Sequence, residues 1–416
     1  MKLKYNIDDR MPAGQLAIYA IQWFILAVAV VATSVWIAPP EERLFFAQKL
    51  FGVMGIAGLI QLLFGHRMPL VVGPAAVLLV GVMSALGARA ATSAIYSSIA
   101  VGGVIITLLS FGGVMRHVQR LFTPRIVVVI LMLIAFTLSP VIKGLIFQPH
   151  AEAEEHLFGL IFTIVGVVAM VILNRTLRGV AKSLVIPIAL VVGSVAYYAL
   201  FPMQPMSQSG ATLRGMIIDK FDWDWSLIIA FIICYTALLI NDIGSIESLG
   251  SMLQAKDMPR RLKRGVRITG VMNIVAGAFG VLGPVNYSMS PGVVASTGCA
   301  SRWPLIPAAT ALALCALSPE VVWALTNIPN PVIGAILLFL MGTQLAASFE
   351  MLHATGSVRS FASGLTVGLP LMVAMLFQLM PHGVVPSVIE PLTGNGFAMG
   401  VIVVIVMEHV INRERE

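Results

Sequence analysis

Long apolar stretches recur from one end of the sequence to the other, and they restrict the possible folds more than any other feature. A helix that spans a bilayer needs about 20 mostly apolar residues. The stretches are continuous and lack the alternation of a barrel strand, so they predict spanning helices, which satisfy their own backbone polar groups. Only 11% of the residues are charged, whereas a soluble domain has about 25%. A soluble enzyme is therefore excluded.

We expect fourteen transmembrane segments in one all-α polytopic membrane protein. They lie near residues 15–38, 46–64, 69–86, 91–113, 122–143, 156–173, 181–201, 225–252, 265–281, 283–300, 304–318, 331–349, 359–380 and 386–411. The first 14 residues contain no short apolar region with a cleavage site, which indicates a retained cytoplasmic lead. Cys234, Cys299 and Cys315 lack CxxC spacing and are interpreted as small core residues, so no disulfide, metal site or cofactor is expected.

The basic residues predict the orientation of these segments. An even number of spans places both termini on one side of the membrane. If that side is the cytoplasm, 20 of the 26 Lys and Arg residues face inward. The six that face outward are Arg43, Lys49, Arg89, Lys143, Arg214 and Lys220. This asymmetry follows the positive-inside rule. It predicts a bacterial-type inner-membrane protein with cytoplasmic termini, and no nucleic-acid partner is expected from the formal charge of +7.

Two short segments are interrupted by a Gly-Pro pair, Gly73-Pro74 in the third and Gly283-Pro284 in the tenth. The third and tenth segments are equivalent if the chain is an inverted repeat of seven plus seven segments. Proline removes a backbone donor and disfavours helix just before it, so a few extended residues followed by a half-helix are expected. Facing breaks of this kind form substrate sites in secondary transporters. An ordinary proline kink is the alternative for either segment alone.

The eighth segment carries two carboxylates well inside the apolar region, Asp242 and Glu247. Charges within a span are costly and are functional candidates. For Asp242 we expect a role in proton coupling or beside the substrate, with a structural buried carboxylate as the alternative. Both interpretations also stay open for Glu247, which lies nearer the cytoplasm. Asn241 and Ser245 fall at i and i+4 and form a polar stripe on the same helix.

Gln22 and Trp23 are the other notable residues deep in a span, in the first segment. Gln22 and Asn241 offer both a donor and an acceptor to a ligand with amide-like edges, and Trp23 can stack on a flat ring. Interhelical hydrogen bonding is the alternative. His66 and His353 are interpreted as surface residues in short cytoplasmic turns. The sequence shows no His, Asp and Ser constellation that indicates catalysis, so no enzyme is expected.

Several motifs resemble landmarks of the nucleobase/ascorbate transporter family, which includes bacterial uracil and xanthine permeases. They are Asp8-Asp9-Arg10-Met11-Pro12 before Gln22, Gly65-His66-Arg67-Met68-Pro69 before the third segment, Gly292 with Thr297-Gly298 and Ser301-Arg302, Pro331-Val332-Ile333-Gly334-Ala335, and Gly394-Asn395-Gly396. The likeness extends from about residue 8 to residue 411.

This resemblance implies a seven-plus-seven inverted repeat with short strands in segments 3 and 10. A core domain would comprise residues 1–114 and 223–320, and a gate domain residues 115–222 and 321–416. Transport would proceed by movement of the core against a dimerised gate, usually with symport of H+ or Na+.

The sequence departs from the family pattern at two substrate positions. In the eighth segment, family members normally have a glutamate shortly before a glycine. When Gly244 is aligned with that glycine, Asn241 occupies the position of the glutamate. In the tenth segment, family members normally have Glu, Gln or Pro followed by Asn. When Gly292 is aligned with the glycine of the family motif, Met289 and Ser290 occupy these two positions. Asn241 can still pair with an imide or amide edge, although hydrogen bonds to a charged group are about twice as strong. Met289 supplies soft apolar contact.

We therefore expect a cation-coupled secondary transporter, with H+ as the coupling ion, that imports a small planar heterocycle of the uracil or xanthine type. A transporter of small organic or inorganic anions on the same fold is the alternative, and a channel or a membrane enzyme would be a different class. The expected partners are membrane lipids and a second copy of the chain. Asp242 and Glu247 are the candidates for ion coupling. The expected substrate-binding residues are Gln22, Trp23, Ala75, Ala76, Val77, Asn241, Ser245, Val285, Asn286, Tyr287, Ser288, Met289 and Ser290.

Overall fold

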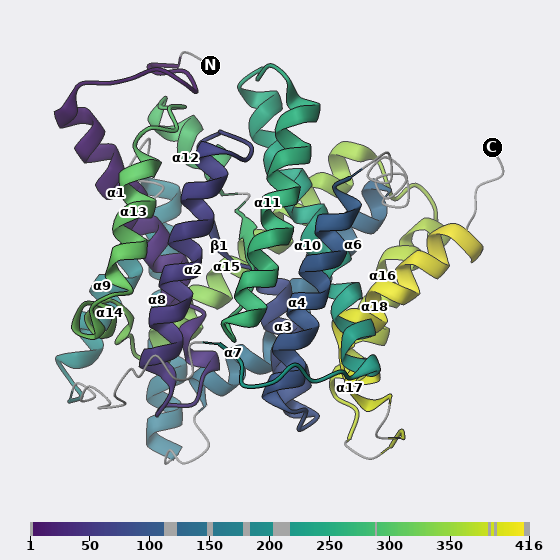
Figure 1. Cartoon of the computed structure of the whole chain (residues 1–416). Coiled ribbons are helices and arrows are strands. Elements are labelled where there is room, and N and C mark those ends of the chain that lie inside the picture. Colours follow the sequence, from purple (N-terminus) through teal and green to yellow (C-terminus); the bar gives the residue numbers. More distant parts are fainter. Residues whose placement is uncertain are drawn as a thin grey trace.

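The computed structural model describes residues 3–111, 123–147, 153–177, 184–202, 217–287, 289–381, 384–386 and 389–411. Within these ranges the chain is mostly helical, with one two-stranded sheet (Figure 1). Each of the fourteen expected segments contains at least one of the observed elements.

The first half of the chain contains α1 (Ala13–Ala32), the 3-10 turn η1 (Val35–Ile37), α2 (Arg43–Leu63), β1 (Val72–Pro74), α3 (Ala76–Gly87), α4 (Thr92–Leu109), α6 (Pro124–Thr137), α7 (Ser139–Ile146), α8 (Ala153–Thr176) and α9 (Val185–Tyr198). The second half contains α10 (Trp225–Met252), α11 (Met258–Ala278), β2 (Pro284–Asn286), α12 (Ser290–Thr297), α13 (Leu305–Cys315), α14 (Pro319–Thr326), α15 (Asn330–Thr355), α16 (Phe361–Gln378), α17 (Glu390–Thr393), α18 (Gly396–Val406) and the π-helical turn η3 (Met407–Ile411).

Eight helices in the described part of the chain are long and apolar enough to cross a membrane. A ninth span is obtained if α13 and α14, which meet at an angle of 109°, are counted together. The protein is thus a multi-pass membrane protein. The number is lower than fourteen because several expected segments consist of shorter pieces. In two of them a strand precedes a short helix: α3 has 12 residues and α12 has 8.

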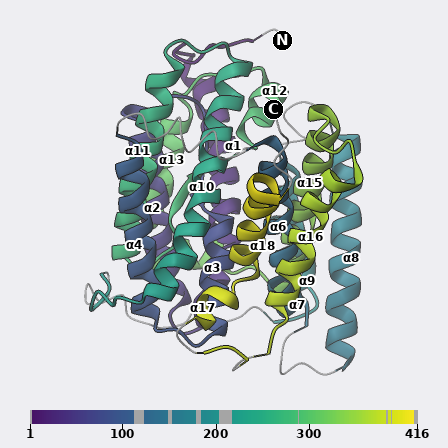
Figure 2. The same ribbon diagram turned by 90° about the vertical axis from the view of Figure 1, so that its right-hand side faces the viewer.

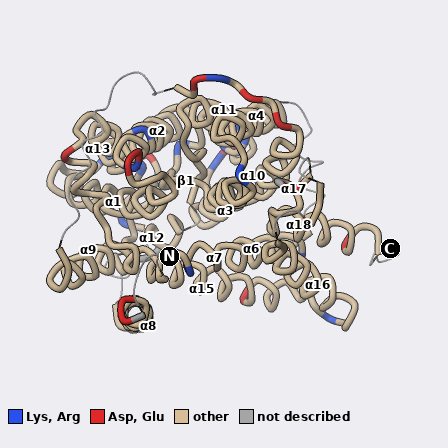
Figure 3. Tube along the Cα trace, turned by 90° about the horizontal axis from the view of Figure 1, so that it is seen from below, with Lys and Arg blue, Asp and Glu red and all other residues tan. Residues whose placement is uncertain are grey.

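The helices pack in two groups. In the first, α4 lies along α11, α2 lies along α13, and α10 contacts both α3 and α4. In the second, α15 contacts α6, α7 and α8, while α16 packs against α18 and α6. Figure 2 shows the first group beside the second, and in Figure 3 α2, α4 and α11 lie on the opposite side from α8 and α16. Contacts of α3 with α6 and of α10 with α17 and α18 join the groups.

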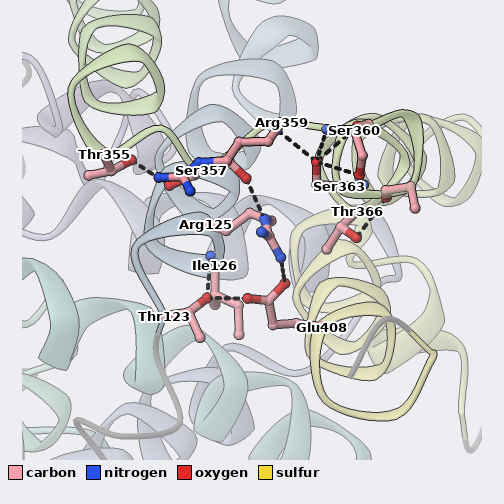
Figure 4. Close-up of polar contacts among 11 residues, drawn as sticks. Thr123, Arg125, Ile126, Thr355, Ser357, Arg359, Ser360, Ser363, Thr366 and Glu408 are labelled. Carbon is pink, nitrogen blue, oxygen red and sulfur yellow. Dashed lines mark hydrogen bonds and ion pairs between the residues drawn. The ribbon is translucent and has the colours of Figure 1, made fainter. Parts of the chain in front are cut away.

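One end of the second group is held together by polar contacts around Glu408 in η3 (Figure 4). Glu408 forms an ion pair with Arg125 at 2.5 Å and accepts a hydrogen bond from the Thr123 hydroxyl at 2.7 Å. Arg125 Nε also donates to the Ser357 carbonyl at 2.9 Å. Thr123 caps α6 by accepting from the Ile126 N–H. The start of α6, the α15–α16 connection and the C-terminal helix are therefore linked through two charged side chains.

The three cysteines are free thiols. Cys234 and Cys299 are buried and Cys315 is partly buried. Their interpretation as small packing residues is consistent with these positions.

Candidate functional site

The two Gly-Pro segments meet at the strand pair near the centre of the fold. β1 and β2 run antiparallel, with Val72 opposite Asn286 and Pro74 opposite Pro284. Because proline lacks an N–H and disfavours helix before it, each segment stays extended before a short helix begins. The expected strands and half-helices in segments 3 and 10 are confirmed.

Hydrogen bonds on both sides of the register extend the contact between the two segments. The Ala75 N–H donates to the Gly283 carbonyl at 2.9 Å, and the Tyr287 N–H donates to the Val71 carbonyl at 2.9 Å. The Tyr287 hydroxyl reaches back and donates to the Pro74 carbonyl at 2.6 Å. The junction between β1 and α3 is thereby tied to the chain that follows β2.

Both glycines of the Gly-Pro pairs are required by close packing. A Cβ on Gly283 would lie 1.7 Å from Asn273 Oδ1, and a Cβ on Gly73 would lie 2.6 Å from Val30 Cγ1. Asn273 also donates from Nδ2 to the Pro284 carbonyl at 2.9 Å. The side chain that excludes a Cβ at Gly283 thus also holds β2 in place.

A cavity of about 380 Å³ lies between this strand pair and the second group of helices. One wall comes from α1, α10 and the ends of both strands, and the other from α6 and α15. Its volume is within the range of small-molecule sites, about 300–1,000 Å³. Its polar side chains are Thr33, Ser34, Asn241, Tyr287, Thr343 and Gln344. Among the described residues that line it there is no Asp, Glu, Lys, Arg or His.

The structure brings together about half of the residues predicted to bind substrate. Those that line the cavity are Ala75, Ala76, Val77, Asn241, Val285, Tyr287 and Met289. Those that are buried but do not line it are Gln22, Trp23, Ser245, Asn286 and Ser290. Ser288 lies outside the described residues. Trp23 instead lines a separate, smaller cavity together with residues of α2 and α13.

The Asn241 side chain is available to a ligand. It lines the cavity, and its amide makes no hydrogen bond within the described part of the chain. In contrast, the Thr33 hydroxyl donates to Val30, and the Thr343 hydroxyl to Leu340, inside their own helices. Asn241 therefore offers an unused donor and an unused acceptor in an uncharged cavity.

Sequence reasoning did not single out Thr33, Ser34, Thr343 and Gln344, although all four line the cavity. Gln344 is a polar residue deep in the twelfth segment, and its position there is a signal that could have found it. Its Nε2 donates to the Leu131 carbonyl at 2.8 Å, which ties α15 to α6 on the far wall.

Asp242 is fully buried directly behind this wall, at the centre of a hydrogen-bonded network. Its Oδ1 accepts from the Asn286 N–H at 3.0 Å and from Asn286 Nδ2 at 2.8 Å. Its Oδ2 accepts from the Thr269 hydroxyl at 2.9 Å. Thr269 in turn accepts from Gln61 Nε2 at 3.0 Å. The carboxylate does not line the cavity, but it holds the strand that does.

His66 belongs to the same network, and its interpretation as a surface residue is wrong. Its side chain is fully buried, and its Nε2 lies 3.0 Å from Asn286 Oδ1. Nδ1 accepts from the Met68 N–H at 3.0 Å, so Nε2 carries the proton and donates to Asn286. Burial lowers the pKa of His66 from 6.5 to about 4, which favours this neutral form. His353 is exposed, as expected.

Glu247 and Ser245 lie on the same helix but differ in exposure. Glu247 is exposed, whereas Ser245 is buried and donates to the Asn241 carbonyl at 2.8 Å. Ser245 therefore supports the helix around Asn241 from behind the cavity wall. Asp242 contacts β2 through the Asn286 N–H.

The sequence matches a known family over most of its length. The model of the Permease family that covers xanthine and uracil permeases aligns with residues 14–383. The chain belongs to this family. It is therefore a permease, a membrane transporter, and not an enzyme.

The curated relatives of this permease carry names of the same kind. The xanthine permease of Bacillus subtilis (strain 168) is 26% identical, covering 86% of this chain and 83% of the relative. The xanthine permease XanP of Escherichia coli (strain K12) is 23% identical, and the match covers 100% of this chain and 96% of the relative. The nucleobase transporter PlUacP of Paenibacillus larvae is 24% identical, and the match covers 87% of this chain and 85% of the relative.

Solved structures show the same fold at low identity. The transmembrane domain of the cyanobacterial bicarbonate transporter BicA has a TM-score of 0.63 and 14% identity, covering 89% of this chain and 99% of that one. The murine anion transporter Slc26a9 in its inward-facing state has a TM-score of 0.64 and 13% identity, and the match covers 96% of this chain and 68% of that one.

Proposed function

We propose that this permease imports a neutral, planar heterocycle of the nucleobase class, with uracil and xanthine as the reference compounds. The observation that carries the proposal is the Asn241 amide, which has no hydrogen-bond partner among the described residues and faces a cavity whose described lining carries no charged side chain. An amide matches the adjacent donor and acceptor of an imide or lactam edge. Burying an uncharged ring there leaves no ion without a partner.

Two further observations support this substrate class. The walls of the cavity are mostly apolar, with Val77, Val285 and Met289 next to the amide-bearing helix, as a flat ring requires. The relatives named as xanthine permeases and as a nucleobase transporter cover most of the chain.

We further propose the fourteen-segment, seven-plus-seven layout with cytoplasmic termini in a bacterial-type inner membrane. The core would comprise residues 1–114 and 223–320, and the gate residues 115–222 and 321–416. The antiparallel pairing of the broken third and tenth segments supports this arrangement. Movement of the core against a gate that dimerises with a second copy would then open the cavity, which lies between the two groups of helices, to either side.

For coupling to a cation, with H+ expected, we propose Asp242 as the protonation site. It is a fully buried carboxylate one hydrogen bond from β2, so a change in its charge alters the contacts of a strand beside the cavity. Glu247, which is exposed, is the second candidate.

The test is uptake of labelled uracil, xanthine and urate into proteoliposomes, with and without an imposed proton gradient. We expect saturable uptake of at least one of these bases. Asn241→Ala is expected to weaken its apparent affinity about tenfold, the equivalent of one neutral hydrogen bond. Thr343→Ala is the matched control, because that hydroxyl lines the same cavity but is already bonded to Leu340. Absence of uptake for every ring compound would refute the proposed substrate.

A small anion is the alternative substrate. Ala76 and Val77, at the N-terminus of α3, line the cavity, and the first N–H groups of a helix lack acceptors within it. Competition for uptake by small organic anions, but not by bases, would favour this alternative. Since none of the described residues that line the cavity is cationic, the neutral heterocycle remains the function proposed.

A further inference from the structure

Another cavity lies where the end of α2 meets the start of α11. It has a volume of about 310 Å³ and is lined by Phe64, Arg67, Arg264, Arg267 and Ile268. The two helices lie side by side in the first group (Figure 1). We call this site the arginine cavity.

No ion pair among the described residues compensates the positive charge of the arginine cavity. None of its three arginines forms an ion pair with a carboxylate in the described part of the chain. Arg67 Nε donates to the Leu63 carbonyl at 2.8 Å, and Arg267 Nε donates to the Ser110 hydroxyl at 3.3 Å. Arg264 makes no hydrogen bond there. The nearby acid Asp8 is already paired with Arg302 at 2.7 Å.

The cavity is also fixed in shape by contacts outside it. The Arg267 guanidinium stacks over the Phe111 ring, 3.9 Å from its centroid, which orients it at the end of α4. Arg261 Nη1 donates to the carbonyls of His66 and Arg67 at 2.8 and 3.0 Å. These contacts hold the turn in which Arg67 adopts a positive φ of 55°.

Exposed apolar side chains border the arginines. Phe64, which lines the cavity, is 65% exposed, and Leu63 beside it is 38% exposed. At the end of α4, Leu108 is 63% and Phe111 51% exposed. Three arginines next to such a surface match a ligand that has an anionic head and an apolar body.

We propose that the arginine cavity binds the phosphate group of an anionic membrane lipid, whose acyl chains lie along Phe64 and the adjacent apolar surface. Guanidinium groups pair with phosphate oxygens through two parallel hydrogen bonds. Basic pockets between transmembrane helices are typical sites for anionic lipid headgroups. Free phosphate shares the anionic chemistry but would leave the exposed Phe64 and the partly buried Ile268 without an apolar partner.

The test is native mass spectrometry of the purified full-length protein, titrated in detergent with phosphatidylglycerol, phosphatidylcholine or inorganic phosphate. We expect specific adducts with phosphatidylglycerol. Each basic residue near an anionic lipid strengthens binding about fivefold. Arg67→Gln combined with Arg264→Gln should therefore weaken phosphatidylglycerol binding about 25-fold.

Arg260→Gln combined with Lys263→Gln is the matched control, because both residues are exposed on α11 and neither lines the cavity. It removes the same charge and should leave binding close to that of the wild type. Equal losses in both double variants would overturn the proposal, since they would show attraction by net charge alone. Equal binding of phosphatidylcholine, or binding of inorganic phosphate in place of the lipid, would also overturn it. Circular dichroism of each variant verifies that the fold is retained.

Discussion

Replacement of Asp242 by asparagine is the sharpest test of the buried network. The carboxylate is fully buried and accepts three hydrogen bonds, two from Asn286 and one from Thr269. In Asp242→Asn the amide oxygen can still accept from Asn286, but the amide nitrogen then faces the Thr269 hydroxyl, which loses its acceptor. Hydrogen bonds to a charged group contribute about 1.5–3 kcal/mol and neutral ones about half of that. Because removing a buried charge also relieves its desolvation penalty, we expect a net loss of about 1–3 kcal/mol.

Asp242→Ala should cost more, because all three donors remain buried without an acceptor. At about 1–3 kcal/mol for each unsatisfied group, the loss is about 3–9 kcal/mol. Thermal unfolding of the purified protein in detergent, monitored by the loss of monodisperse material, measures this stability. The melting temperature should fall from the wild type to Asp242→Asn and further to Asp242→Ala. An asparagine variant that melts with the alanine variant would contradict this reading of the network.

Transport separates the structural role of Asp242 from its coupling role. Asp242→Asn is expected to abolish gradient-driven accumulation in proteoliposomes while retaining part of the substrate binding. Thr269→Val is the matched control, since it removes the two hydrogen bonds of the hydroxyl, one to Asp242 and one from Gln61, at a cost of about 2–4 kcal/mol, but leaves the carboxylate in place. It should accumulate substrate whenever it is folded. Full coupled accumulation by Asp242→Asn would refute the assignment of Asp242 as the protonation site.

Three further predictions concern the pH response, the Glu408 contacts and the strand pair. Because the folded pKa of His66, about 4, lies below its ordinary value of 6.5, the unfolded state binds the proton first. Stability should therefore fall by about 3 kcal/mol as pH drops from 6.5 to 4, and His66→Gln should flatten that dependence in denaturant unfolding at several pH values. Glu408→Ala leaves Arg125 partly buried without its partner and should cost about 1–3 kcal/mol in the same unfolding assay; in a double-mutant cycle, addition of Arg125→Ala should cost less than it does alone. Gly283→Ala would place a Cβ 1.7 Å from a side-chain amide oxygen and should lower the yield of folded protein in size-exclusion chromatography, whereas Gly292→Ala, with open space at its Cβ, should not.

The helices and the strand pair could be predicted from local sequence because their causes are local. Long apolar runs specify helices by the length a bilayer requires, and each Gly-Pro pair specifies a break through the chemistry of proline. The matched positions of Gly73 and Gly283 were enough to expect that the two breaks meet, as they do in the register of β1 and β2. Asn241 could be placed at the site from its depth in the eighth segment.

The environment of His66 could not be predicted in this way. A histidine between glycine and arginine, just before Met68 and Pro69, has the composition of an exposed turn. Its partner Asn286 is 220 residues away in the sequence, and only the folding of the second half of the chain onto the first brings the two together. The same holds for the far wall of the cavity, where Gln344 lies on a helix whose position depends on packing against α6.

The network and the cavity share two short stretches of backbone, and this explains how a group outside the cavity can affect it. Asp242 directly follows Asn241 in α10, and Asn286, at the end of β2, lies between Val285 and Tyr287, so these two network residues are covalently joined to residues of the cavity wall. A charge change on Asp242 alters its two hydrogen bonds with Asn286, including the one to the backbone N–H. In the proposed mechanism, β2 and the following Tyr287 would respond to protonation without any contact between proton and substrate. On this geometry, loss of the Asp242 charge should change substrate affinity and coupling together, whereas loss of the Asn241 amide should change affinity alone.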